Sequence, residues 1–348
     1  MIGPLFSSAS RLAPPPGTTA LAVAPTPVRL GVGAVAELPS ALAALGVSRP
    51  MIATGPGVVA AGLVEPVRAT LADATVWVRG DEVDAETRYR RDGRDGLVAL
   101  GGGSTIAAAR TVREAVGNPP SVAVPTTAGP GVEMIAGACS LVLRDPALDR
   151  SLPPDLTAAT GLDALGHCIE SFLALGFQPF ADAAAVEGMR YVFRGLEAAV
   201  QDGSDLDARS AMAVGSLLAG TAANKGLGVA DALARAIEVD APGRHATIAA
   251  LLLPHALRFN RPECEPRMAE LASRMGLGRA GDGPGHLITL VELLRATSPL
   301  PRKLRDVPGP SRDRLADYAR AACLDPALAV NPRPCTPELL AELLDKAW

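Results

Sequence analysis

The chain lacks the features that mark secreted and membrane proteins. Its five cysteines are odd in number and scattered without a Cys-x-x-Cys pair, which fits a reducing compartment better than a disulfide framework. No apolar run reaches the length of a membrane-spanning helix, and the first 25 residues lack the basic start and apolar core of a secretion signal. We therefore expect a cytoplasmic protein with no membrane partner.

Clusters of Lys and Arg are also absent, and the formal net charge is only −4. The sequence thus gives no electrostatic reason to expect nucleic acid or an anionic membrane as a partner, and a small molecule is the ligand we expect. What the chain does have is length and apolar content. Its 348 residues, 48% of them hydrophobic, are enough for one large or two medium domains with their own cores.

The pattern of apolar residues changes near residue 150. Before it, helical stretches such as VVAAGLVEPVRATL alternate with the short apolar runs PMIATG, ATVWV, GLVALGGG and SVAVPTT, which predicts a parallel sheet with flanking helices. After Pro153 and Pro154, long amphipathic segments follow and the strand pattern ends. We predict an α/β domain over residues 1–153, with 1–25 as a loose N-terminal arm, and an all-α domain over 154–348.

Two polar turns in the first half follow apolar strands. In LVALGGGSTIAAAR the chain passes from strand to helix through Gly101, Gly102, Gly103 and Ser104. Unhindered backbone N–H groups and a helix N-terminus suit a diphosphate, although such a run is about as often only a tight turn. In VPTTAGPGVE, the hydroxyls of Thr126 and Thr127 would by themselves mark only a polar loop.

One segment of the second half suggests metal chemistry. GLDALGHCIESF places Asp163 and His167 four residues apart, on the same side of a helix. A carboxylate beside an imidazole is half of a metal site. Without further context, a core histidine with satisfied hydrogen bonds would be the simpler interpretation of His167.

Taken in order, these segments resemble the iron-containing alcohol dehydrogenase family, which includes the maleylacetate reductases. The similarity runs through GPGVVAAGL, DGLVALGGGST, VPTTAGPGVE, DPALDRSLPPDLTAATGLDALGHCIE, RHATIAALLLPHALRFN and NPRP. The resemblance implies a dinucleotide-binding α/β domain, a helical domain, and a cleft between them for a nicotinamide cofactor, the substrate and usually a divalent metal. It also implies that residues 101–104 hold the diphosphate and that Thr126 and Thr127 line the nucleotide site.

The metal ligands of the family carry over only in part. Asp163 and His167 match its GlDALxH motif, and His245 matches another ligand with different flanks. Asp231 stands in place of a histidine ligand, and Arg235 in place of the second histidine of an HxxxH motif. The resemblance thus implies a set of two Asp and two His, which suits a divalent ion such as Fe²⁺ or Zn²⁺.

Arg235 leaves two further interpretations open. Its positive charge, one helical turn from Asp231, could replace the metal by pairing with that carboxylate, or could bind a substrate carboxylate. In the glycine turn, Ala107 and Arg110 replace an Asp and a Lys of many metal-using relatives. The small residue is similar to the maleylacetate reductase branch, which is regarded as not needing metal, whereas Asp163 is a feature of the metal-using branch.

Two more departures concern the cofactor cleft. NAD-preferring relatives carry an Asp at the position of Gly55, where it bonds the ribose hydroxyls and repels a 2′-phosphate, so its absence slightly favours NADP. After VEM, a β-hairpin that the family has before its DPxL segment is missing.

These observations predict an NAD(P)-dependent oxidoreductase that interconverts an aldehyde or ketone and an alcohol by hydride transfer. Asp163, His167 and Arg235 are the candidate catalytic residues, with a divalent metal polarising the carbonyl oxygen. The alternatives are a metal-independent enzyme similar to maleylacetate reductase and a pseudo-enzyme that retains nucleotide binding only. Dehydroquinate-synthase-like cyclases share the architecture, but GLDALGH argues against them. The substrate and the oligomeric state stay open, although relatives are often homodimers.

Overall fold

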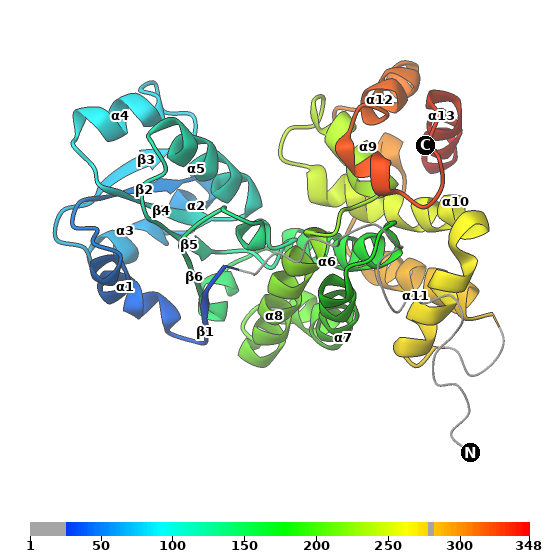
Figure 1. The fold of residues 1–348 in the computed structure, drawn as a ribbon, viewed down its shortest axis with the longest axis horizontal. Coiled ribbons are helices and arrows are strands. Elements are labelled where there is room, and N and C mark those ends of the chain that lie inside the picture. The colour runs from blue at the N-terminus through cyan, green and yellow to red at the C-terminus, as the bar shows by residue number, and fades with distance from the viewer. Residues whose placement is uncertain (1–25, 278–281) are drawn as a thin grey trace, which may run out of the picture.

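The first half of the chain is built on one parallel sheet (Figure 1). A computed structural model describes residues 26–277 and 282–348. Its six strands have the order β1-β6-β5-β4-β2-β3, and all the pairs are parallel. The bounds are β1 Val28–Leu30, β2 Pro50–Thr54, β3 Thr75–Val78, β4 Gly96–Gly101, β5 Ser121–Pro125 and β6 Leu141–Arg144. The parallel sheet predicted from the sequence is confirmed.

Helices cover both faces of this sheet, so its central strands are buried on both sides. On β4, Val98 and Leu100 pack with one face and Leu97 and Ala99 with the other. The helices are α1 Leu38–Ala44, α2 Pro56–Ala60, α3 Val64–Arg68, α4 Ala85–Arg91 and α5 Gly103–Ala115. The prediction of one helix over VVAAGLVEPVRATL is wrong, because the chain turns at Gly62 (φ 72°) and divides it into α2 and α3.

The second half is helical and is arranged around α6. Fifteen of the twenty residues of α6 are buried, so its polar side chains lie inside the protein rather than in water. Of the helices in the part of the chain that the structure describes, none is both long and apolar enough to cross a membrane. The bounds are α6 Pro154–Leu173, α7 Pro179–Gln201, α8 Leu206–Ala223, α9 Val229–Glu238, α10 His245–Arg274, α11 Gly283–Thr297, α12 Leu315–Ala322 and α13 Pro337–Ala347.

The loop after β5 contacts the helical half of the chain. It leads through the short helix η2 (Val132–Met134) to β6, and no strand pair intervenes, as the sequence predicts. At Gly131 (φ 66°) the loop lies so close to α8 that a Cβ added at Gly220 would be 1.9 Å from the Gly131 carbonyl oxygen. The side chain of Asn224 also donates a hydrogen bond to the Met134 carbonyl, at 3.1 Å. The sheet and the helical half are therefore in direct backbone contact.

This contact predicts that Gly220→Ala destabilises the fold. A methyl group at Gly220 would overlap backbone atoms, which cannot move aside as a flexible side chain can, so we expect the free energy of unfolding to fall by about 1–3 kcal/mol. Urea denaturation followed by circular dichroism measures it. The control is Gly166→Ala on α6, where the added Cβ would lie 3.7 Å from Leu253, an ordinary contact. Equal stability of the two variants would contradict the prediction.

Candidate metal and dinucleotide site

A cluster of ionisable side chains lies where α6, α9 and α10 meet. Helix α6 supplies Asp163 and His167, α9 supplies Asp231, and α10 begins with His245. The ring nitrogen Nε2 of His167 lies 3.8 Å from Oδ1 of Asp163 and 3.5 Å from Oδ1 of Asp231. Nε2 of His245 lies 4.0 Å and 3.2 Å from the same two oxygens. The structure thus brings together the four side chains that the sequence singled out.

Several polar atoms in this cluster are buried without a hydrogen-bond partner. They are Oδ1 of Asp163 and both ring nitrogens of His167. Each such atom costs about 1–3 kcal/mol unless another group satisfies it. The ligand atoms of Asp163, His167 and His245 lie within 4.8 Å of one another, a spacing that fits one divalent cation between them. A metal would therefore satisfy Oδ1 of Asp163 and Nε2 of His167, which the protein alone leaves unpaired.

Burial and mutual charge shape the electrostatics of the cluster. Burial raises the pKa of Asp163. Burial alone would lower the pKa of His245, but the carboxylates of Asp231 and Asp163 raise it to about 9. Burial would raise the pKa of Asp231, yet the two imidazoles and Arg235 hold it well below its usual range. A divalent cation competes with protons for the imidazole nitrogens, because metal-binding imidazoles must be neutral.

Arg235 contacts Asp231 from the side away from the imidazoles. Its Nη2 lies 2.5 Å from Oδ2 of Asp231, whereas Oδ1 of Asp231 faces the two histidines. The guanidinium also donates to Asp325 through Nε at 2.7 Å and Nη2 at 3.0 Å. Asp325 precedes the short helix η6 (Pro326–Val330) and accepts the backbone N–H of Ala327 at 2.8 Å. The ion pair therefore uses one carboxylate oxygen of Asp231 and leaves the other aimed at the cluster.

The predicted diphosphate turn lies at the carboxyl end of the sheet, between β2 and β4, where the strand order reverses. β3 pairs with β2 on one side of this point, and β5 pairs with β4 on the other side. Open parallel sheets bind ligands at such a reversal of strand order. Gly55 follows β2, and a Cβ there would lie 3.0 Å from Oγ1 of Thr105. A Cβ at Gly101 would lie 2.8 Å from the Thr105 side chain, and one at Gly102 would lie 3.0 Å from Thr127. A side chain would be crowded most at Gly101, and these glycines let the backbone approach a diphosphate closely.

The N-terminus of α5 forms the other part of the candidate diphosphate site. Gly102 is the N-cap of α5, Gly103 and the exposed Ser104 are its first residues, and their backbone N–H groups point along the helix axis toward its N-terminal end. Thr126 follows β5 and donates its backbone N–H to the Gly101 carbonyl at 3.1 Å. Sequence reasoning did not single out Thr105, although a threonine next to a glycine run was the available signal.

The loop after β5 links the diphosphate turn to the metal cluster. Thr127 packs beside Gly102, and a Cβ at Gly129 would lie 3.8 Å from Thr160 of α6. Thr160 is three residues before Asp163, or about 4.5 Å along the helix axis. A dinucleotide held at the glycine turn and a metal held by α6 would therefore be neighbours.

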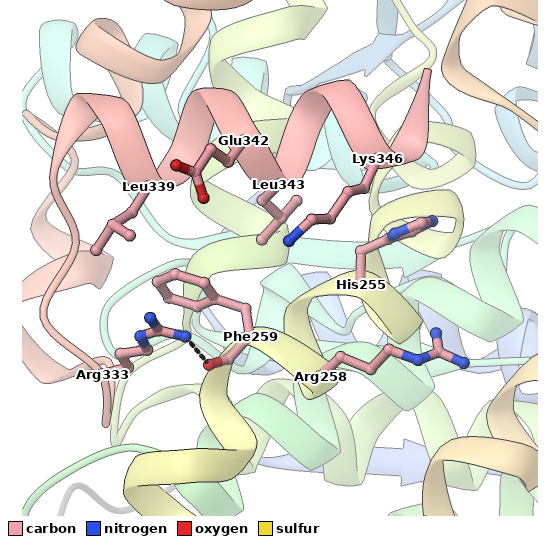
Figure 2. Close-up of a pocket in the computed structure, with 8 residues that line it drawn as sticks. All are labelled: His255, Arg258, Phe259, Arg333, Leu339, Glu342, Leu343 and Lys346. Atoms are coloured by element: carbon pink, nitrogen blue, oxygen red, sulfur yellow. Dashed lines mark hydrogen bonds between the residues drawn. The ribbon is translucent and has the colours of Figure 1, made fainter.

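Another histidine of the helical half lies away from the cluster. His255 is ten residues after His245 on α10, about 15 Å along the helix axis. It lines a different cavity of about 190 Å³ between α10 and α13, together with Arg258, Phe259 and Lys346 (Figure 2). Burial and the nearby Arg258 lower the pKa of His255 to about 4, so the imidazole is neutral at physiological pH. His255 does not contribute to the candidate metal site.

Comparisons with known proteins cover nearly the whole described chain. The model of the iron-containing alcohol dehydrogenase family matches residues 25–144, and the model of the C-terminal part of the Fe-containing alcohol dehydrogenase family matches residues 157–348. The 4-hydroxybutyrate dehydrogenase of Cupriavidus necator is 31% identical, with 92% of this chain and 98% of the relative covered. The crystal structure of a 1,3-propanediol oxidoreductase has a TM-score of 0.83 at 27% identity, covering 93% of this chain and 98% of that one. The maleylacetate reductase of Agrobacterium tumefaciens, at 23% identity, a TM-score of 0.79 and coverage of 95% and 98%, shares the fold.

Proposed function

Because the chain belongs to the iron-containing alcohol dehydrogenase family, we propose that it uses NAD(P) and a divalent metal to interconvert an alcohol and an aldehyde or ketone. The metal ligands in this proposal are Asp163, His167, Asp231 and His245. The observation that supports them most is the pair of buried, unpartnered atoms Oδ1 of Asp163 and Nε2 of His167, which lie 3.8 Å apart. We take residues 1–153 as the dinucleotide domain and 154–348 as the metal and substrate domain.

Each group in the site has a distinct task in this proposal. A bound divalent metal supplies Lewis-acid polarisation of the carbonyl oxygen. Asp163 and His167 hold it from a buried helix that cannot shift without disturbing the core. Arg235 neutralises the outer oxygen of Asp231, so that two carboxylates can be buried side by side at lower electrostatic cost. The glycine turn and the loop 126–131 place the dinucleotide next to this group.

A metal-independent reductase similar to maleylacetate reductase is the second candidate. The ion pair between Arg235 and Asp231 favours it, since a guanidinium already partners one of the ligand carboxylates. Ala107 on α5 also favours it, because a small residue at this position resembles the maleylacetate reductase branch. Against it stand the unpartnered atoms of Asp163 and His167, which an ion pair at Oδ2 of Asp231 does not satisfy.

NADP(H) is the cofactor that the surroundings of Gly55 favour. There is no carboxylate at Gly55 to repel a 2′-phosphate. Exposed Arg79 follows β3, the strand next to β2, and its backbone N–H donates to the Thr54 carbonyl at 2.9 Å. A basic residue thus flanks Gly55 across the sheet, at a place that the linear sequence does not reveal.

The substrate is proposed to be a small aldehyde or ketone and the corresponding alcohol. The relative named for 4-hydroxybutyrate and the structure named for 1,3-propanediol both act on short aliphatic alcohols, which motivates this class. A cytoplasmic location and a homodimer remain predictions from the sequence. Neither nucleic acid nor a membrane is part of the proposal.

Asp163→Asn tests the metal role. Removing this charge should abolish stoichiometric metal and lower carbonyl reduction by about 100-fold or more, because the metal contributes several kcal/mol to the transition state. Metal content is measured by mass spectrometry after purification without chelators, and reduction by NADPH oxidation with a panel of aldehydes. Dinucleotide affinity should stay unchanged.

The matched control for this test is Asp155→Asn, an exposed carboxylate on the first turn of the same helix. It should retain metal and activity. Full activity of Asp163→Asn without metal would instead support the metal-independent reductase. Wild-type protein that binds NADPH but reduces no aldehyde would support the pseudo-enzyme.

Gly55→Asp tests the cofactor preference. A carboxylate at this position should repel the 2′-phosphate and lower the ratio of kcat/KM for NADPH over NADH by about tenfold or more, a change of about 1.4 kcal/mol. The control is Gly55→Asn, which has the same size without the charge and should affect both cofactors alike. A wild-type enzyme that already prefers NADH would contradict the proposal.

A further inference from the structure

The N-terminus of α9, the helix that carries Asp231, is buried and held by side chains from distant parts of the chain. The first four backbone N–H groups of a helix have no partner within it. In α9, Glu170 accepts hydrogen bonds from three of them, at 3.2 Å from Gly228, 2.7 Å from Ala230 and 3.3 Å from Asp231. Asn331 accepts the remaining one, from Val229, at 3.2 Å. Two side chains thus satisfy the whole first turn.

Glu170 comes from the helix that also carries two of the proposed ligands. It lies three residues after His167 on α6 and is only 4% exposed. One helix thus bears both proposed ligands and the carboxylate that accepts hydrogen bonds from the first turn of α9, which includes Asp231. Its oxygens face backbone donors of α9, so they are already occupied by hydrogen bonds.

Asn331 ties the third ligand helix into the same network. Its amide and that of Asn260 bond each other in both directions, at 3.0 Å and 2.8 Å. Asn260 is part of α10, which begins with His245. Both asparagines are buried. The three helices α6, α9 and α10 are therefore linked through one buried polar network on the N-terminal side of α9.

The glycine before α9 makes this approach geometrically feasible. A Cβ added at Gly228 would lie 2.7 Å from Oε1 of Glu170 and 3.0 Å from Oδ1 of Asn331. Any side chain at Gly228 would push these groups away from the helix. The close contact therefore depends on a glycine at position 228.

We propose that Glu170, assisted by Asn331, is a positioning residue that sets the place of Asp231 in the metal site. Loss of its carboxylate frees the first turn of α9 and displaces Asp231 while leaving Asp163 and His167 in place. This inference rests on the proposed metal site. Groups that orient metal ligands in this way typically change metal affinity by about 10–100-fold when they are replaced.

Glu170→Gln in the full-length protein is the test, with Co²⁺ as the probe. The dissociation constant for Co²⁺, measured by absorption titration, should rise by about tenfold or more. Hydrogen exchange of the amides in 228–231 should become faster, and NADPH affinity should not change. If Glu170→Gln does not fold, Asn331→Ala removes the other half of the network and is expected to shift both readouts in the same direction.

The matched control is Asp205→Asn, which makes the same carboxylate-to-amide change at another helix N-terminus. Asp205 accepts the N–H groups of Asp207 and Ala208, at 3.0 Å and 2.9 Å, at the start of α8. This variant should leave the Co²⁺ dissociation constant within about twofold of the wild-type value, well below the shift expected for a ligand-positioning group. Wild-type Co²⁺ affinity in Glu170→Gln, or an equal loss of Co²⁺ affinity in Asp205→Asn, would overturn this inference but not the proposed metal site. Wild-type protein without Co²⁺ affinity would overturn the proposed metal site as well.

Discussion

The burial of charged side chains on α6 is the constraint on which the rest of the structure depends. This helix is packed by α7, α8 and α10, yet it carries Asp163, His167 and Glu170 inside the protein. A buried charge is costly unless other groups compensate it. The surrounding helices provide that compensation through the imidazole of His245 and the first turn of α9. The helical half is thus organised around the polar groups of one central helix.

Asp231 and Arg235 show how the chain accommodates a second carboxylate in this place. The guanidinium is held between Asp231 and Asp325, and it partners only the outer oxygen of Asp231. Ion pairing and the proposed metal binding would therefore use different atoms of the same side chain. The two interpretations that the sequence left as alternatives are compatible in this geometry, because Oδ1 of Asp231 still faces both imidazoles.

Much of the fold could be predicted from the sequence, because its strands and helices have strong local patterns. The runs at β2, β4 and β5 and the glycine turn before α5 were recognised in this way. The division of α2 from α3 was missed because one glycine with positive φ outweighed a helical pattern. Contacts across the fold could not be predicted. Glu170 and Asp231 are 61 residues apart, and Arg79 lies beside Gly55 only because β3 pairs with β2.

The central claim is that Asp163, His167, Asp231 and His245 bind one divalent metal beside the dinucleotide turn. Anomalous diffraction from crystals grown with Co²⁺ and NADPH tests it most directly. We predict a single anomalous peak about 2.0–2.2 Å from the ligand atoms of these four residues, with Arg235 still on the outer oxygen of Asp231. No peak among them, with NADPH bound at the glycine turn and Asp231 turned wholly toward Arg235, would contradict it.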